Sequence, residues 1–304
     1  MNSKSDLIVC VIGLGSMGFG VATALLRDGF SVTGFDLSTN AMTRFQSLGG
    51  KIAPSLSAAA RGADIVICLV VNATQTETAL FAADGAAVAM EKVGTIQSCA
   101  TMSPDDARDI ATRAGALGVK YIDAPISGGA VRAAAGEVTI TASGAPEAVS
   151  HAKPVLDCIG TNGDELGDKL GAGAAFKIVN QLLAGVHIAA AREAITFDKE
   201  NNIYISEIYE IITASAGNSW MFENRVPHIL DGDYAPRRTI DIFTKDLGMV
   251  SDIGRGLKFP TPIASTALQM FLMTAAAGMG RDDDASIARM IAGLGGLTLP
   301  GMEG

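Results

Sequence analysis

A glycine-rich hexapeptide near the start of the chain has the residue types and spacing to bind a phosphate. It consists of Gly13, Leu14, Gly15, Ser16, Met17 and Gly18, and it follows an apolar segment, residues 7–12. In this pattern the first glycine permits a tight turn, the second lets a pyrophosphate approach the backbone, and the third lets the following helix pack closely. The N–H groups at the start of that helix also attract phosphate. These six residues therefore predict a dinucleotide-binding turn.

An acidic residue, Asp36, lies at the expected end of the second strand. A carboxylate at this point accepts hydrogen bonds from both hydroxyls of an adenosine ribose and repels the 2′-phosphate of NADP. Leu37 and Ser38 supply no guanidinium to pair with such a phosphate. Arg44 lies one or two turns into the next helix, where we expect it to face solvent. Asp36 therefore favours NAD over NADP as the cofactor.

A second turn, Asp-Ala-Pro-Ile-Ser-Gly-Gly at residues 123–129, ends a later expected strand. Open α/β sheets bind their ligands at the carboxyl ends of strands. There the hydroxyl of Ser127 and the backbone N–H groups of Gly128 and Gly129 would form a receptor for a carboxylate. Taken alone, the segment is explained equally well by an ordinary glycine turn.

Three polar residues, Lys177, Asn180 and Gln181, are spaced i, i+3 and i+4 in a segment rich in apolar residues. On a helix this spacing puts them on one face, so we expect a polar patch within a buried helix. Desolvation lowers the pKa of a lysine, which would let Lys177 take the proton of a substrate alcohol while the two amides orient it or the substrate. The alternative is a lysine that extends into water.

The elements that would position these residues divide into two groups. Strand-like segments separated by helices fill the first half, at residues 7–12, 31–35, 65–71, 95–99, 120–123 and 138–142. This alternation predicts a doubly wound α/β fold of the Rossmann type, with helices on both faces of a parallel sheet. Helix-compatible segments follow at 173–199, 206–214, 220–230, 240–257, 263–278 and 284–291. We therefore expect an NAD-binding Rossmann domain over residues 1–163 and an all-α C-terminal domain over residues 164–304.

Length and charge narrow the class of protein. A chain of 304 residues fits about two domains. The net charge of −9 opposes a phosphate backbone, so we expect no nucleic-acid partner. The three histidines have no ligand spacing, so we expect no metal. The four cysteines form no CxxC pair and fit buried free thiols in a reducing compartment.

Nothing in the sequence favours a membrane protein. Residues 259–280 carry no charge, but Pro260, Pro262 and several hydroxyl side chains indicate a buried helix rather than a membrane span. The polar first six residues do not fit a secretory leader. We expect a soluble cytoplasmic protein with no membrane partner.

Four motifs, taken together in this order and spacing, resemble the β-hydroxyacid dehydrogenase family over essentially the whole chain. They are the hexapeptide, the turn at 123–129, the segment Gly-Ala-Gly-Ala-Ala-Phe-Lys at 171–177 and Phe-Thr-Lys-Asp-Leu at 243–247. The resemblance implies that Lys177 is the catalytic base and that Ser127, Gly128 and Gly129 bind the substrate carboxylate. It also implies cofactor contacts, by position in the family pattern, for Val70, Val71, Asn72, Thr101 and Lys245. Without the resemblance, Lys245 and Asp246 would be an ordinary charge pair on a helix surface.

Two positions depart from the family pattern. Ala100 replaces a serine, and Gln181 replaces an asparagine that would be one methylene shorter. Within the family, the segments after Lys177, at 216–225 and at 262–268 are most similar to the L-threonate dehydrogenase branch.

That branch oxidises four-carbon sugar acids with NAD to 2-oxo acids. The resemblance therefore implies oxidation of L-threonate to 2-dehydro-L-erythronate. The alternatives are 3-hydroxyisobutyrate dehydrogenase and tartronate semialdehyde reductase. Less favoured are an imine reductase, a class that generally lacks the lysine, and a non-catalytic dinucleotide-binding protein. The family usually forms oligomers, so we expect a homodimer or homotetramer.

Overall fold

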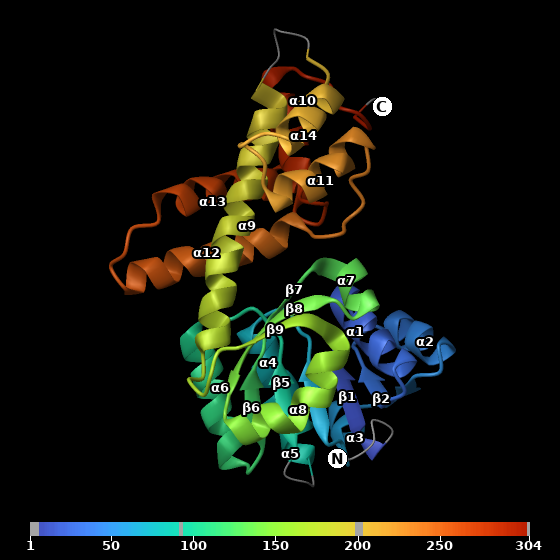
Figure 1. The fold of residues 1–304 in the computed structure, drawn as a ribbon. Helices are drawn as coiled ribbons and strands as arrows, with labels where there is room; N and C mark the ends of the chain where they lie inside the picture. Colours follow the sequence, from blue (N-terminus) through green and yellow to red (C-terminus); the bar gives the residue numbers. More distant parts are fainter. Residues whose placement is uncertain (1–5, 91–93, 198–202, 303–304) are drawn as a thin grey trace. The chain divides into compact units, whose positions relative to one another are not determined.

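The computed structural model describes residues 6–90, 94–197 and 203–302, which form two compact units, residues 1–177 and 178–304 (Figure 1). Strand structure gives way to helices close to the expected boundary at residue 163, whereas packing divides the chain later, inside helix α9 (Ala172–Phe197). The first two turns of α9 therefore pack with the sheet. Lys199, at the end of the expected long helix, and Met1–Ser5 lie outside the described residues.

The strands of the first unit are β1 (Ile8–Ile12), β2 (Ser31–Phe35), β3 (Lys51–Ile52), β4 (Ile65–Cys68), β5 (Thr95–Ser98), β6 (Lys120–Asp123), β7 (Ile126–Ser127), β8 (Val138–Gly144) and β9 (Gly160–Glu165). Its helices before α9 are α1 (Ser16–Arg27), α2 (Thr39–Ser47), α3 (Leu56–Ala60), α4 (Ala73–Phe81), α5 (Ala86–Ala89), α6 (Pro104–Ala116), α7 (Gly129–Ala135) and α8 (Pro146–Ile159).

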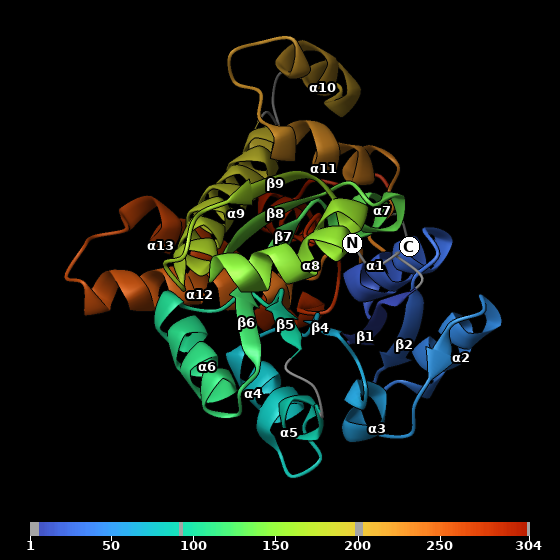
Figure 2. The ribbon, with the colours of Figure 1, turned by 60° about the horizontal axis from the view of Figure 1, so that its bottom comes forward.

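The described strands form one sheet in the order β3-β2-β1-β4-β5-β6-β8-β7, with β9 paired to β8. Figure 2 shows β2, β1, β4, β5 and β6 side by side. The strands from β3 to β6 are parallel, in the order usual for a doubly wound dinucleotide-binding sheet. This confirms the predicted Rossmann-type class.

The far end of the sheet departs from the sequence prediction. Strand β8 runs antiparallel to β6 and β7, and β9 (Gly160–Glu165) is a further strand after the last expected one at residues 138–142. The sequence of β9 is Gly-Thr-Asn-Gly-Asp-Glu, which has no apolar residue to mark it as a strand. Strands β3 and β7 are two residues each, too short for a periodic pattern.

The sheet of the first unit is covered on both faces, as continuous apolar strands require. Val9 and Val11 of β1 lie in a core with α1 and α8, whereas Cys10 and Ile12 lie in a second core with α4 and α6. Alternate side chains of a strand point to opposite faces, so both faces of the strand are used for packing.

The second unit is helical and packs around the later turns of α9. Its other elements are α10 (Ile205–Thr213), α11 (Trp220–Leu230), α12 (Ile240–Gly256), α13 (Pro262–Thr274), η2 (Ala275–Met279) and α14 (Ser286–Gly295). Ile188 of α9, Phe243 of α12 and Phe271 of α13 share one core. Ile195 of α9 packs with α11 and α14 in another.

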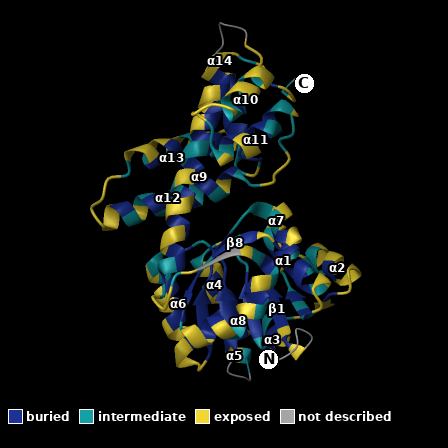
Figure 3. Ribbon diagram, in the orientation of Figure 1, coloured by how far each residue is buried: buried dark blue, intermediate teal, exposed yellow. Residues whose placement is uncertain are grey.

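Two helical stretches keep apolar faces exposed within the single chain (Figure 3). Helix α9 and the stretch Pro262–Met279 have the length and composition of a membrane span, a test that core helices of soluble proteins also pass. In α13, Ala267 and Phe271 are buried, but Ile263 and Met273 are exposed. The prediction that this region forms a buried helix is therefore wrong for the single chain.

None of the four cysteines, all of which lie within the described residues, forms a disulfide. Cys10, Cys68 and Cys99 are buried within the first unit, whereas Cys158 of α8 is partly exposed. Burial raises the pKa of the Cys68 thiol to about 12 and also raises the pKa of Cys10 and of Cys99 above the usual value.

Candidate functional site

The predicted binding segments of the first unit follow strands that end at one edge of the sheet. Strands β1, β2, β4, β5 and β6 are parallel, so their carboxyl ends meet there. At this edge, a backbone hydrogen bond connects the residue after one strand to the last residue of the neighbouring strand. Gly13 N–H donates to Phe35 O at 2.9 Å, and Ala124 N–H donates to Ser98 O at 2.8 Å. The residues after these strands are Gly13 to Gly18, Asp36, Val70 to Asn72, Thr101 and Ser127 to Gly129.

The three glycines of the hexapeptide have three different environments. Gly13 has φ +91°, and an added Cβ would lie 2.6 Å from the carbonyl oxygen of Leu69. At Gly18 an added Cβ would lie 1.8 Å from the carbonyl oxygen of Gly13, so helix and turn approach too closely for a side chain. At Gly15, the N-cap of α1, an added Cβ would meet no atom within 4 Å. Gly13 and Gly18 are therefore required by the fold, and Gly15 leaves open space at the helix start.

The carboxylate of Asp36 is oriented by the backbone on both sides of it. Leu14 N–H donates to its Oδ2 at 2.6 Å, and Ser38 N–H donates to its Oδ1 at 2.7 Å. Arg44 is exposed, and its guanidinium carbon lies 4.6 Å from the ring centroid of Phe19. The structure thus attaches Asp36 to the glycine turn and holds the nearby guanidinium over an aromatic ring.

The helices that follow β4 and β5, α4 and α6, each begin with a side-chain cap from the preceding loop. Asn72 Oδ1 accepts from Gln75 N–H at 2.8 Å, and Val71 N–H donates to Gln75 Oε1 at 2.9 Å. Thr101 is half-buried and lies two residues before Ser103, which forms a capping box with Asp106 at the start of α6. These caps fix the loop backbones at the edge of the sheet.

The turn at residues 123–129 requires glycine and is attached to helix α1. Gly128 and Gly129 have φ +134° and +79°, a backbone conformation that other residues rarely adopt. Helix α7 follows directly and packs on α1, where a Cβ on Gly20 would lie 2.7 Å from Ala134 N. Arg27 of α1 donates to Ala134 O at 2.8 Å. The turn at residues 123–129, helix α7 and helix α1 are therefore parts of one packed assembly.

Lys177 lies beside this turn. Its side chain is buried at 6% exposure, and Nζ donates to the carbonyl oxygen of Ile126 at 2.8 Å. Ile126 immediately precedes Ser127. The alternative of a lysine extended into water does not fit the structure.

Asp123, at the end of β6, is a buried carboxylate to which the sequence assigned no role of its own. Its Oδ2 accepts from Ala174 N–H at 2.8 Å and from Ser143 Oγ at 3.3 Å. Burial raises the pKa of Asp123 to about 6, and hydrogen bonds from Ala174, Ser143 and the Gly171 backbone oppose this rise. No local pattern could have identified it, because its partners are 20 and 51 residues away.

Gln181 and its neighbours form a polar group in the second unit. Gln181 Nε2 donates to Asp246 Oδ2, and Gln181 Oε1 accepts from Asn180 Nδ2 at 2.9 Å. Lys245 Nζ lies 2.8 Å from Asp246 Oδ1. Asp246 is buried, so Lys245 and Asp246 are not the ordinary surface pair that their sequence alone allows.

The predicted single polar face of α9 is wrong in one respect. Lys177 and Gln181 lie on the buried side of the helix, but Asn180 is exposed, together with Phe176 and Val179. Successive helix residues are about 100° apart, so Asn180 lies about 60° to one side of Lys177 and falls outside the narrow buried stripe that includes Gln181.

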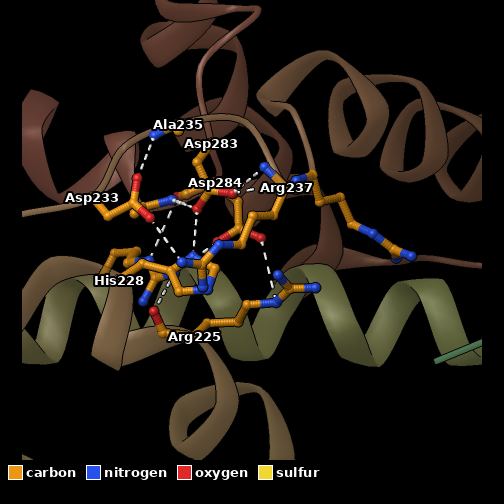
Figure 4. A network of polar contacts seen from close by, with 10 residues as sticks. Arg225, His228, Asp233, Ala235, Arg237, Asp283 and Asp284 are labelled. Atoms are coloured by element: carbon orange, nitrogen blue, oxygen red, sulfur yellow. Dashed lines mark hydrogen bonds and ion pairs between the residues drawn. The ribbon is translucent and has the colours of Figure 1, made fainter. Parts of the chain in front are cut away.

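A larger buried polar network holds the second unit together (Figure 4). Asp283 Oδ1 lies 2.9 Å from His228 Nδ1, and Oδ2 accepts from Arg237 N–H at 3.0 Å. Burial would raise the pKa of Asp283, but the hydrogen bonds from His228 and the backbone hold it below its usual value. Asp284 Oδ1 accepts from Arg192 Nη2 at 2.7 Å, and both side chains are fully buried. The partners of Asp283 and Asp284 lie 55 and 92 residues away in the sequence, so no local pattern identifies this network.

No set of three His, Cys, Asp or Glu side chains is placed to hold a metal ion among the residues that the structure describes.

Comparisons with known proteins agree with this arrangement. The NAD binding domain of 6-phosphogluconate dehydrogenase matches residues 8–167, and the NAD-binding domain of NADP-dependent 3-hydroxyisobutyrate dehydrogenase matches residues 171–291. L-threonate dehydrogenase of Cupriavidus necator is 49% identical over 291 residues, 96% of this chain and 97% of the relative. L-threonate dehydrogenase of Escherichia coli K12 is 41% identical over 304 residues, 100% of both chains.

A solved structure named 3-hydroxyisobutyrate dehydrogenase from Salmonella typhimurium is 45% identical, with a TM-score of 0.89, and covers 94% of this chain and 100% of its own. The resemblance predicted from the four motifs is thereby confirmed. The chain belongs to the 3-hydroxyisobutyrate dehydrogenase-like family of NAD-binding β-hydroxyacid dehydrogenases.

Proposed function

We propose that this protein oxidises L-threonate to 2-dehydro-L-erythronate, with NAD as the hydride acceptor and Lys177 as the general base. The observation that carries the proposal is the position of Lys177, whose buried Nζ is hydrogen bonded to Ile126 O, one residue before Ser127. The names of relatives that are 41–49% identical over nearly the whole chain support the choice of substrate.

The first unit fits NAD at its glycine turn. Gly15 leaves space at the start of α1, where backbone N–H groups attract a pyrophosphate. Asp36, oriented by Leu14 and Ser38, would accept the ribose hydroxyls and oppose a 2′-phosphate. We also assign cofactor contacts to Gly13, Ser16, Met17, Gly18, Val70, Val71, Asn72, Thr101 and Lys245. When bound, NAD supplies the nicotinamide that accepts the hydride.

The turn at Ser127, Gly128 and Gly129 would bind the substrate carboxylate through the serine hydroxyl and backbone N–H groups. Fixing the carboxylate orients the neighbouring C2 hydroxyl for reaction. In its neutral form the amine of Lys177 can donate one N–H to Ile126 O while its lone pair accepts the hydroxyl proton. Asn180 and Gln181 are our candidates for contacts to the remaining hydroxyls.

A second candidate function is 3-hydroxyisobutyrate dehydrogenase, the name of the Salmonella typhimurium structure that is 45% identical. Tartronate semialdehyde reductase is a further alternative with the same carboxylate and the same base. The buried lysine argues against an imine reductase and against a non-catalytic dinucleotide-binding protein.

A dehydrogenase screen with the purified protein tests the proposal. Three- and four-carbon hydroxy acids are compared with NAD and NADP side by side, by absorbance of the reduced cofactor. We expect the highest kcat/KM for L-threonate with NAD. A preference for 3-hydroxyisobutyrate or tartronate semialdehyde would replace the substrate assignment, and tight NAD binding without turnover on any acid would overturn the enzymatic one.

We propose further that the chain is a cytoplasmic homodimer or homotetramer. The exposed Phe176 and Val179 of α9 and Ile263 and Met273 of α13 support this, because large apolar side chains gain free energy when a second copy covers them. Light scattering coupled to gel filtration gives the mass in solution, and a monomer at micromolar concentration would contradict the proposal.

A further inference from the structure

The start of the lysine-bearing helix α9 is bound by polar side chains from two strands of the sheet. Asp123 comes from the end of β6 and Ser143 from β8, and the two residues are paired in the antiparallel register of these strands. Both side chains are buried, with exposures of 1% and 0%. Their partners are the backbone N–H groups of Gly173 and Ala174 in the first turn of α9.

The contacts form a connected set of hydrogen bonds. Ala174 N–H donates to Asp123 Oδ2 at 2.8 Å, and Gly173 N–H donates to Ser143 Oγ at 3.1 Å. Ser143 Oγ in turn donates to Asp123 Oδ2 at 3.3 Å. The first N–H groups of a helix have no partner within the helix, and the partial positive charge there favours a carboxylate. Asp123 therefore satisfies both needs of this helix end from outside the helix.

Glycine is required for this close approach. An added Cβ on Gly173 would lie 2.4 Å from Thr141 O and 2.7 Å from Asp123 O. Gly171 has φ +87°, and an added Cβ would lie 2.8 Å from Pro104 O. The glycines of the Gly-Ala-Gly segment thus let the helix start lie against the strands, and Asp123 and Ser143 hold it there.

Lys177 lies one turn after these contacts, on the same helix. Its Nζ reaches Ile126 O, three residues after Asp123. The same strand end therefore fixes both the start of the helix and the tip of the lysine side chain. A helix that shifts along its axis by one residue moves by about 1.5 Å, enough to break the bond to Ile126.

We propose that Asp123 is a positioning residue. It fixes the start of α9 along the helix axis relative to the sheet, and it thereby holds the amine of Lys177 beside the Ser127 turn. This inference rests on the proposed function, because it assumes that Lys177 is the general base. Asp123 itself touches neither substrate nor cofactor in this account and acts through Lys177.

The test is a double-mutant cycle with Asp123→Asn and Lys177→Ala. We expect Asp123→Asn to lower kcat about 10- to 100-fold, since a displacement of about 1 Å costs on that order. The KM for L-threonate and the NAD dissociation constant should change less than about twofold. In the Lys177→Ala background the same substitution should change kcat less than about twofold, because the interaction it supports is gone.

Two further variants keep the result interpretable. Ser143→Ala removes only the second contact and should lower kcat in the same direction by a smaller factor, which preserves the test if Asp123→Asn does not fold. Ser55→Ala removes the side-chain cap of α3, where Ser55 Oγ accepts from Ala58 N–H at 3.2 Å, and it should leave kcat unchanged.

The outcomes distinguish the positioning role of Asp123 from the role of Lys177 as the base. Wild-type kcat in folded Asp123→Asn, or an equal loss in both backgrounds, would overturn the positioning role while leaving the proposed function intact. Wild-type kcat in Lys177→Ala would overturn the assignment of the base, and with it the inference.

Discussion

Lys177 Nζ donates a hydrogen bond to Ile126 O at 2.8 Å, and Ile126 is covalently bonded to Ser127. The lysine is thus hydrogen bonded to the residue that precedes the proposed substrate turn. The same carbonyl leaves the amine room for only a few orientations, which is the requirement for a base that must meet one hydroxyl.

Replacing Lys177 by alanine removes the proposed general base. We expect kcat to fall by about 10²–10⁴, the usual effect of losing such a group, with the NAD dissociation constant nearly unchanged. The matched control is Lys153→Ala, since Lys153 is an exposed lysine paired with Asp157 at 2.9 Å on α8. Steady-state kinetics with a fluorescence titration of NAD measure both quantities, and wild-type turnover in Lys177→Ala would refute the role.

Replacing Asp36 by alanine removes the carboxylate proposed to bind the adenosine ribose. Hydrogen bonds to a charged group contribute about 1.5–3 kcal/mol, so we expect the KM for NAD to rise about 10- to 100-fold. The KM for NADP should rise far less, because the repulsion of its phosphate is lost at the same time. The ratio of the two kcat/KM values measures this change, and a wild-type enzyme that already prefers NADP would contradict the assignment.

Replacing Gly18 by alanine should lower the stability of the fold, whereas replacing Gly15 by alanine should weaken NAD binding. Gly18→Ala places a methyl group against the carbonyl of Gly13, and such overpacking costs about 1–3 kcal/mol of unfolding free energy or more. Gly15→Ala meets no protein atom, so unfolding should be unchanged while NAD binding weakens. Urea unfolding and NAD titration of both variants distinguish them; loss of stability in Gly15→Ala would show that its space is not kept for a ligand.

The carboxyl of Asp123 predicts a pH-dependent stability. Burial raises its pKa from 3.8 to about 6 in the folded chain, so between these values the folded state binds more protons than the unfolded state. Its contribution to the unfolding free energy therefore decreases as pH rises from about 4 to about 6, by up to about 3 kcal/mol. The neighbouring Cys99 and Tyr121 keep their protons in this range, because burial raises the pKa of both.

The measurement for Asp123 is urea unfolding of wild type and Asp123→Asn at pH 4.5 and pH 7.5. The difference between the two proteins should move in favour of the variant at the higher pH. An unchanged difference would show that Asp123 titrates near its ordinary value.

The buried ion pair of Arg192 and Asp284 should contribute more to the unfolding free energy than an exposed ion pair does. Both side chains are fully buried, so Asp284→Ala leaves an uncompensated guanidinium and should cost about 3–5 kcal/mol of unfolding free energy. Replacing an exposed partner, as in Asp157→Ala, should cost no more than about 1 kcal/mol. Chemical unfolding followed by circular dichroism measures both, and equal small losses would contradict the role of burial.

The sequence predicted most reliably those structural features that depend on residues close together along the chain. The requirement for glycine at positions 13 and 18 follows from local backbone geometry, and the structure confirms it. The parallel pairing of strands β1 to β6 followed from continuous apolar strands, whereas the antiparallel pairing of β8 did not.

Contacts between distant residues could not be predicted in the same way. Asp123 and Ala174 are 51 residues apart, and His228 and Asp283 are 55 apart, so no spacing rule connects them. The exposure of Asn180 depends on how wide the buried stripe of α9 is, which only packing decides. Strand β9 is held by pairing with β8 and not by apolar residues of its own.

The distribution of the thiols makes this chain suited to chemical labelling at one place. Cys10, Cys68 and Cys99 are enclosed and their thiols stay protonated, so a maleimide or iodoacetamide reagent has little thiolate to attack in the folded protein. Cys158, partly exposed and lying 3.8 Å from Ala24 O of α1, is the position left for attachment. A fluorophore attached there would lie against α1, the helix that begins at the glycine turn, without the need for an engineered cysteine.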